Sequence, residues 1–144
     1  MLKKDTLSHY LETHQIEWAN TLPENCPPED ILVPENEDFY RLILNKDKIV
    51  ADDWKPYVEL YPEKKFVGKA FINANGLSIS KNSDFNELTK LPNMKNQFKG
   101  LAKVTLNPTD GVLKKTGSDD NHFTWWRTTS FDENSAEIVN NEEA

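Results

Sequence analysis

Four side chains of this sequence, Arg41, Ser78, Ser80 and His122, carry groups that can bind an anion or move a proton, although they lie far apart in the chain. Arg41 stands within an apolar stretch, residues 39–44, where a guanidinium needs an anionic partner from the protein or from a ligand. Because acids outnumber bases, we expect a carboxylate of the chain to be that partner. Hydroxyl and imidazole groups serve nucleophilic and acid–base catalysis.

The two serines alternate with Leu77 and Ile79 in residues 76–80. This alternation is typical of a strand that turns its leucine and isoleucine inward and its serines outward. Neither serine has the GxSxG sequence of a nucleophile elbow, and alternating serines usually form the solvent face of a strand. Catalysis by Ser78 and Ser80 together with His122 is therefore an alternative and not our first expectation.

Two adjacent tryptophans mark residues 121–127 as a further strand. Alternate side chains of a strand share a face, which groups His122, Thr124 and Trp126 on one side and Phe123, Trp125 and Arg127 on the other. Each face then carries an indole, so we expect the strand to be covered on both sides. The second indole either faces a pocket or a partner, or is covered by a loop or helix, for which the first helix is a candidate.

The chain contains four tryptophans in 144 residues. Tryptophan and tyrosine are enriched at protein interfaces, because each ring buries a large area at a low entropy cost. Trp54 and Tyr57 belong to an aromatic cluster in residues 52–63. We therefore expect the partner-binding residues to be Trp125, Trp126, Trp54 and Tyr57.

Other classes of site are not supported by the sequence. His122 with Asp119 and Asp120 is a candidate metal cluster, but the loop lacks the spacing of converging ligands, so we expect no metal. The chain has no glycine-rich phosphate cradle of the GxxxxGK[ST] or GxGxxG type. The single cysteine, Cys26, cannot form an internal disulfide, and we expect a cytoplasmic location.

The order Phe-Tyr-Arg at residues 39–41, followed by Gly-Leu-Ser-Ile-Ser at 76–80, resembles the arginine strand and the serine strand of ADP-ribosyltransferase-like folds. The resemblance implies that Arg41 and Ser78 or Ser80 hold NAD. It provides no late catalytic glutamate, since Glu133 and Glu137 lie in a tail that we expect to be irregular. The same two strands resemble those of small uncharacterised bacterial proteins, and that likeness implies no activity.

These residues require a scaffold, and the pattern predicts an α+β domain with a mostly antiparallel sheet over residues 1–131. An amphipathic helix is expected at residues 5–20, capped by Asp5 or Thr6, followed by an acidic, proline-rich connector at 21–38. Strands are expected at 39–44, 65–73, 76–80, 101–106, 112–115 and 121–127, with one short internal helix at 84–91. Residues 132–144 are expected to form an acidic, mobile tail with at most a short helix.

The net charge of −7 is unevenly distributed. Residues 1–40 carry nine acids and two lysines, residues 41–115 carry fourteen bases and eight acids, and residues 116–144 carry seven acids and one arginine. The acidic ends either fold back on the basic middle or form a face for a basic partner. The acidic balance argues against nucleic-acid binding. The sequence contains neither a membrane-length apolar run nor an apolar signal segment.

From the aromatic excess, the negative charge and the incomplete catalytic set, the sequence predicts a small cytoplasmic bacterial accessory protein. It would act by binding another protein, as an immunity or inhibitor module does, with its oligomeric state unspecified and no cofactor required. The alternative is an ADP-ribosyltransferase-like enzyme, or a degenerate relative, that binds NAD or another nucleotide at Arg41, Ser78, Ser80 and His122.

Overall fold

The computed structural model describes residues 2–139 and shows an α+β chain built on one antiparallel sheet. Within these residues the sheet has eight strands in the order β1-β2-β6-β7-β4-β3-β5-β8. Their bounds are Lys3–Thr6 (β1), Asp30–Val33 (β2), Glu37–Ile43 (β3), Leu77–Ser80 (β4), Gly100–Leu106 (β5), Gly111–Lys115 (β6), His122–Arg127 (β7) and Glu137–Val139 (β8). The expected α+β class with a mostly antiparallel sheet is confirmed.

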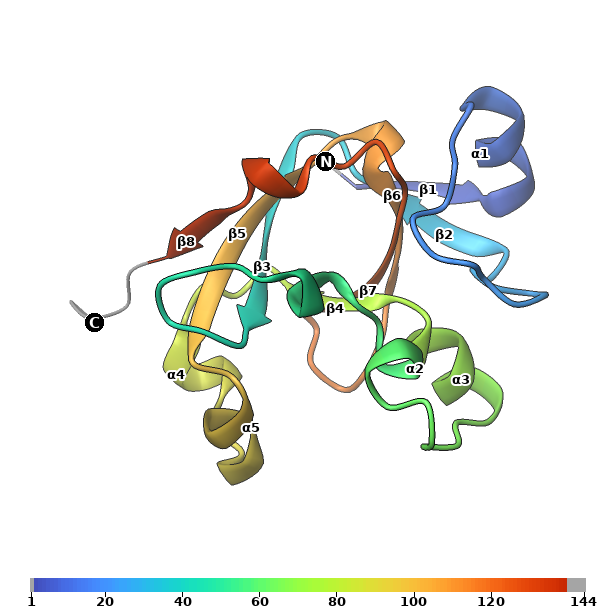
Figure 1. Cartoon of the computed structure of the whole chain (residues 1–144). Coiled ribbons are helices and arrows are strands. Elements are labelled where there is room, and N and C mark those ends of the chain that lie inside the picture. The colour runs from blue at the N-terminus through green and yellow to red at the C-terminus, as the bar shows by residue number, and fades with distance from the viewer. Residues whose placement is uncertain (1, 140–144) are drawn as a thin grey trace.

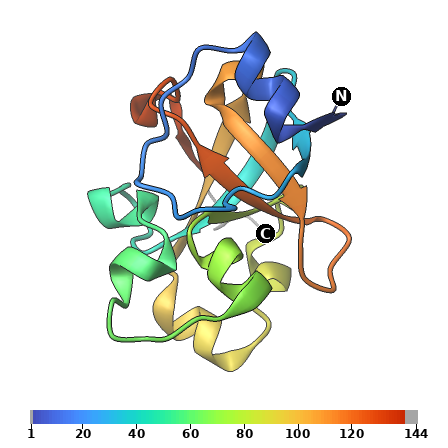
Figure 2. The ribbon, with the colours of Figure 1, turned by 90° about the vertical axis from the view of Figure 1, so that its right-hand side faces the viewer.

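The described residues contain five short α-helices: Leu7–Thr13 (α1), Tyr57–Leu60 (α2), Gly68–Ala74 (α3), Phe85–Leu88 (α4) and Pro92–Gln97 (α5). They also contain three 3-10 turns, at Ala51–Trp54 (η1), Pro108–Asp110 (η2) and Glu133–Ser135 (η3). Helices α2 to α5 gather at the end of the molecule away from α1 (Figures 1 and 2). None of the helices in the described part of the chain has the length and apolarity needed to cross a membrane.

The sheet consists of two parts that meet at a narrow junction. Strands β3 and β5 pair over seven positions, and β4 and β7 pair over four, but β3 and β4 pair only at Tyr40 opposite Ser80. The two parts lie on opposite sides of the view in Figure 1. A buried apolar cluster with members from both parts fills the space between them, and Phe39 of β3 packs edge-on against Phe123 of β7.

The other face of β6 and β7 is covered by the N-terminal segment. Trp126 and Val112 are directly opposite in the β6–β7 ladder and belong to a second buried cluster with Tyr10 of α1. Trp125 belongs to the first cluster. The alternation expected for this strand is thus observed, and each of the two faces buries one indole in its own cluster.

The N-terminal part has a shorter helix than expected, and two strands flank it, one of them inside the expected extended connector. Residues 3–6 form β1, and α1 spans only Leu7–Thr13, with the Thr6 hydroxyl accepting from the His9 amide at 3.2 Å. The apolar triplet Ile31-Leu32-Val33 belongs to β2, which pairs with both β1 and β6. Residues 30–33 are thus extended, as expected for the connector, and a ladder with two strands satisfies their main-chain amides and carbonyls.

Two other predicted elements differ. Residues 65–73 were expected to form a strand, but they contain α3, whose Ile72 carbonyl accepts from the Trp126 indole at 3.2 Å. The segment expected to be an irregular tail contains β8, which pairs with β5 through Glu137 opposite Lys103. In both places a contact with a distant strand overrides the local pattern. The tail prediction for residues 140–144 lies outside the described residues.

Candidate functional site

A cavity of about 490 Å³ opens where β3 and β4 part. The two strands form no ladder beyond the single pair of Tyr40 and Ser80. The residues after Tyr40 on β3 and those before Ser80 on β4 line the space. Helices α2 and α5 and the segment containing α4 supply the remaining walls. The volume is typical of a small-molecule site. The cavity therefore results from the split in the sheet.

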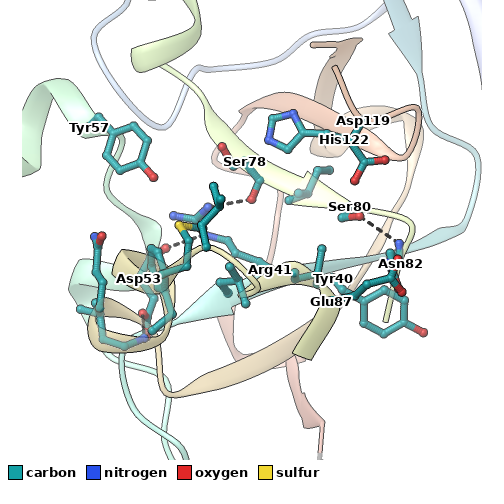
Figure 3. Close-up of a pocket in the computed structure, with 18 of the residues that line it drawn as sticks. Tyr40, Arg41, Asp53, Tyr57, Ser78, Ser80, Asn82, Glu87, Asp119 and His122 are labelled. Atoms are coloured by element: carbon teal, nitrogen blue, oxygen red, sulfur yellow. Dashed lines mark hydrogen bonds between the residues drawn. The ribbon is translucent and has the colours of Figure 1, made fainter. Parts of the chain in front are cut away.

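The Arg41 guanidinium crosses this split. Its Nε donates to the main-chain carbonyl of Asp53 at 2.7 Å, and its Nη1 donates to the main-chain carbonyl of Ser78 at 2.8 Å. A continued ladder would place Leu42 opposite Ser78, so the arginine takes an acceptor that a strand amide would otherwise use. Figure 3 shows the guanidinium between Tyr57 and Ser78.

The expected ion pair of Arg41 is not found. Among the described residues no carboxylate oxygen lies within 4.0 Å of its guanidinium, and no hydrogen bond is made by Nη2. Burial lowers the pKa of Arg41 to about 10, against the charges of Tyr57 and Asp53, which raise it. The guanidinium stays charged at neutral pH, and its charge is directed at carbonyl dipoles and the cavity.

Asp53 holds the rim on which Arg41 rests. Its side chain is 3% exposed, and its two oxygens accept from the amides of Leu44 at 2.9 Å and Val50 at 2.8 Å. These bonds tie the 3-10 turn Ala51–Trp54 to the end of β3. The carboxylate is therefore occupied by the main chain, and the residue's carbonyl is left to accept from Arg41.

Ser78, Ser80 and His122 share one face of the β4–β7 ladder. Ser80 is directly opposite His122, and Ser78 is two positions along the same strand. All three line the cavity with Arg41. The Ser80 hydroxyl accepts from the Asn82 amide at 2.9 Å, and Figure 3 shows the His122 ring above β4 close to Ser78. The structure thus brings together the four residues of the alternative hypothesis.

The far walls of the cavity are largely apolar. Tyr57, Leu60 and Tyr61 lie on one side, and Met94 and Phe98 lie on the other. The amide of Gln97 donates to the Tyr61 hydroxyl at 3.0 Å and joins the two walls. The cavity therefore places rings and aliphatic groups next to the guanidinium.

Several cavity residues were not anticipated from the sequence. Tyr40, Asn82, Glu87 and Asp119 line the space and surround the Ser80 end in Figure 3. Tyr40 had a signal, since it is adjacent to Arg41 in the strand and pairs with Ser80. Asp119 was considered beside His122 only as part of a metal cluster, and Glu87 had no signal, because a carboxylate in a short helix is ordinarily solvated. Both bring a negative charge to the cavity, but neither takes the place of the late glutamate of ADP-ribosyltransferase-like folds.

The residues expected to bind a partner lie mostly inside the molecule. Trp125, Trp126 and Trp54 are at most 3% exposed, and only Tyr57, at 36%, reaches the surface. The Trp125 indole donates to the Asp110 carbonyl at 3.0 Å, so its polar group is satisfied internally. Their burial argues against the three tryptophans as docking residues, because a partner cannot reach them while the sheet is intact.

The two glutamates of the predicted tail are engaged elsewhere. Glu133 pairs with Arg127 at 3.1 Å, and Glu137 pairs with Lys103 at 3.2 Å. Neither lines the cavity. In residues 2–139 no group of three His, Cys, Asp or Glu side chains is arranged to hold a metal ion.

Comparison with protein-family models, with curated proteins and with solved structures finds no match for this chain. The chemistry of the cavity is therefore inferred from its own residues.

Proposed function

We propose that this chain binds a small anionic ligand in the cavity between β3 and β4, with Arg41 holding the negative group. The observation that carries the proposal is the position of the Arg41 guanidinium, which faces the cavity and bonds to two main-chain carbonyls instead of a carboxylate. A partly buried guanidinium that no described carboxylate contacts directly is costly, and an anion bound at Nη2 would offset that cost.

The neighbouring groups favour a ligand of the nucleotide class. Phosphate groups match the forked donors of an arginine, and the apolar wall formed by Tyr57, Tyr61 and Phe98 suits a planar ring. The resemblance of the arginine and serine strands to ADP-ribosyltransferase-like folds leads to the same class, with NAD as the first candidate. The protein would then be such an enzyme or a relative that keeps only the binding site.

Binding predicts stabilisation by ligand, measured as a rise in melting temperature and by calorimetry with NAD, ADP-ribose, AMP and inorganic diphosphate at millimolar concentration. A ligand at one hundred times its Kd adds about 2.7 kcal/mol to the free energy of unfolding. Arg41→Lys keeps the charge but loses the fork, and we expect it to weaken binding at least tenfold.

Arg127→Lys is the matched control, because Arg127 lies outside the cavity and pairs with Glu133. It is expected to change the melting temperature of the free protein but to keep the shift caused by ligand. If none of the four compounds stabilises the protein, or if Arg41→Lys responds as the original chain does, the proposal is wrong.

Binding of another protein, in the manner of an immunity or inhibitor module, is a weaker proposal. It keeps the acidic ends as a face for a basic partner, but the burial of Trp125, Trp126 and Trp54 removes its aromatic anchors. A small-molecule cavity does not require those residues. We therefore place ligand binding first.

A further inference from the structure

The two ring nitrogens of His122 have different surroundings. Nδ1 lies 3.0 Å from the main-chain carbonyl of Thr116 and 3.0 Å from the Thr116 hydroxyl. A carbonyl oxygen can only accept, so the short contact assigns the ring proton of neutral His122 to Nδ1. The Thr116 hydroxyl also lies 2.8 Å from the Thr124 hydroxyl, which can accept its proton. A continuous chain of hydrogen bonds thus holds the Nδ1 edge of the ring.

The second nitrogen is left for the cavity. In a neutral ring protonated at Nδ1, Nε2 has a lone pair and can only accept. No hydrogen bond to Nε2 occurs within the described residues, although His122 lines the cavity and is opposite Ser80 on β4. In Figure 3 the ring lies on the same side of β4 as the Ser78 side chain, above the guanidinium. The cavity therefore pairs a cationic donor, Arg41, with an imidazole acceptor.

We propose that Nε2 of His122 accepts a hydrogen bond from a ligand hydroxyl, and that Thr116 is the positioning residue that holds the ring in this tautomer. The proposal rests on ligand binding in the same cavity and narrows the ligand class. The ligand carries a hydroxyl near its anionic group, so that the anion meets Arg41 while the hydroxyl meets His122. Inorganic diphosphate satisfies the first contact only, whereas ADP-ribose can satisfy both.

The tautomer can be measured without any ligand. Long-range proton–nitrogen correlation spectra of ¹⁵N-labelled protein, recorded at alkaline pH where imidazoles are neutral, distinguish a protonated Nδ1 from a protonated Nε2. The missing signal of a His122→Gln variant assigns the resonance. We expect the proton on Nδ1. A ring protonated on Nε2, which is the form preferred by free histidine in water, overturns the proposal.

Thr116 variants test the positioning role. Thr116→Val retains the carbonyl but removes the hydroxyl that contacts Nδ1, so we expect a detectable fraction of the other tautomer. Thr116→Ser restores the hydroxyl and is expected to restore the original spectrum. If the valine variant keeps the spectrum unchanged, Thr116 does not position the ring through its side chain.

A pair of His122 variants separates the roles of the two ring nitrogens. Asparagine places an amide near the position of Nδ1, whereas glutamine places an amide oxygen near that of Nε2. For ADP-ribose we expect His122→Asn to bind at least tenfold more weakly than the original chain and His122→Gln to lose less. For diphosphate we expect the two variants to bind alike, since this ligand has no carbon-bound hydroxyl from which His122 could accept a hydrogen bond.

The opposite order, with glutamine weaker than asparagine for ADP-ribose, would show that His122 acts through its bond to Thr116 and would overturn the proposal. If neither compound binds the original chain, the proposed function fails. The tautomer spectrum then still decides whether Nε2 is held unprotonated, so the two failures are distinguishable.

Discussion

At the scale of single residues, the carboxylate of Asp53 determines the shape of the cavity rim. Its two oxygens accept from the amides of Leu44, which directly follows β3, and Val50, which directly precedes η1. The carbonyl of the same residue accepts from Arg41. Loss of the carboxylate would therefore disturb the loop that presents an acceptor to the guanidinium.

Asp53→Asn is expected to lower the free energy of unfolding by about 2 kcal/mol, because the new side chain offers one acceptor oxygen where two partly buried main-chain amides need partners. Chemical denaturation measures the change. Asp52→Asn is the control one residue away, since Asp52 is exposed and pairs with exposed Lys55, and it should cost no more than about 0.5 kcal/mol. Equal losses in the two variants would contradict the role given to Asp53.

At the scale of elements, β6 depends on the glycine at its first position. Gly111 has φ of +134°, a conformation that side-chain-bearing residues rarely adopt. A Cβ at this position would collide with the main-chain oxygen of Trp126 and approach Nε1 of Trp125 to 2.8 Å. Close contact between β6 and β7 therefore leaves no room for a side chain.

Gly111→Ala is expected to cost about 3–5 kcal/mol, from backbone strain together with a clash in a packed ladder. Gly68→Ala provides a matched comparison, because Gly68 also has positive φ, +59°, but its Cβ would meet no atom within 4 Å. That variant should lose about 1 kcal/mol from strain alone. Unfolding in denaturant measures the loss in each variant. Similar losses would mean that crowding at β6 is unimportant.

At the scale of the whole molecule, the N-terminal residues cover one face of the sheet and are hydrogen-bonded to a segment from the second half of the chain. The hydroxyl of Tyr10 on α1 donates to the carbonyl of Pro108 at 2.7 Å, across 98 positions of sequence. Its ring is fully buried in the cluster that contains Trp126. Burial, followed by the charge of Asp110, raises the pKa of Tyr10 to about 12.

This shift predicts a loss of stability in alkali. The folded state holds the phenolic proton more tightly than the unfolded chain, in which tyrosine titrates near a pKa of about 10. The contribution is therefore complete below about pH 10 and is lost as the pH rises toward 12. Tyr10→Phe should be less stable than the original chain by about 1 kcal/mol at pH 8, for want of the hydrogen bond, and about equally stable at pH 11.

Denaturation curves of both proteins between pH 8 and 11 measure the difference. A constant difference between Tyr10→Phe and the original chain over this range would mean that the phenol does not couple folding to pH.

Much of the sheet could be predicted from local patterns. The strands at residues 39–44, 76–80, 101–106 and 121–127 were recognised because alternation and β-branched residues are local properties, and the sharing of faces in β7 follows from the same period of two. The strands β1, β2 and β8 and the helix α3 were not recognised. Each depends on a partner strand or ring far away in sequence, which no window of a few residues contains.

The sequence alone determined which groups were available: one guanidinium in an apolar strand, two alternating hydroxyls, one imidazole on another strand, and indoles on both faces of that strand. Only the tertiary structure decided how these groups are used. It buries the tryptophans in two clusters, and it separates β3 from β4 so that Arg41 faces a cavity with Ser78, Ser80 and His122. The physical reason is that strand pairing is non-local, so the point at which a sheet stops pairing depends on packing across the whole chain.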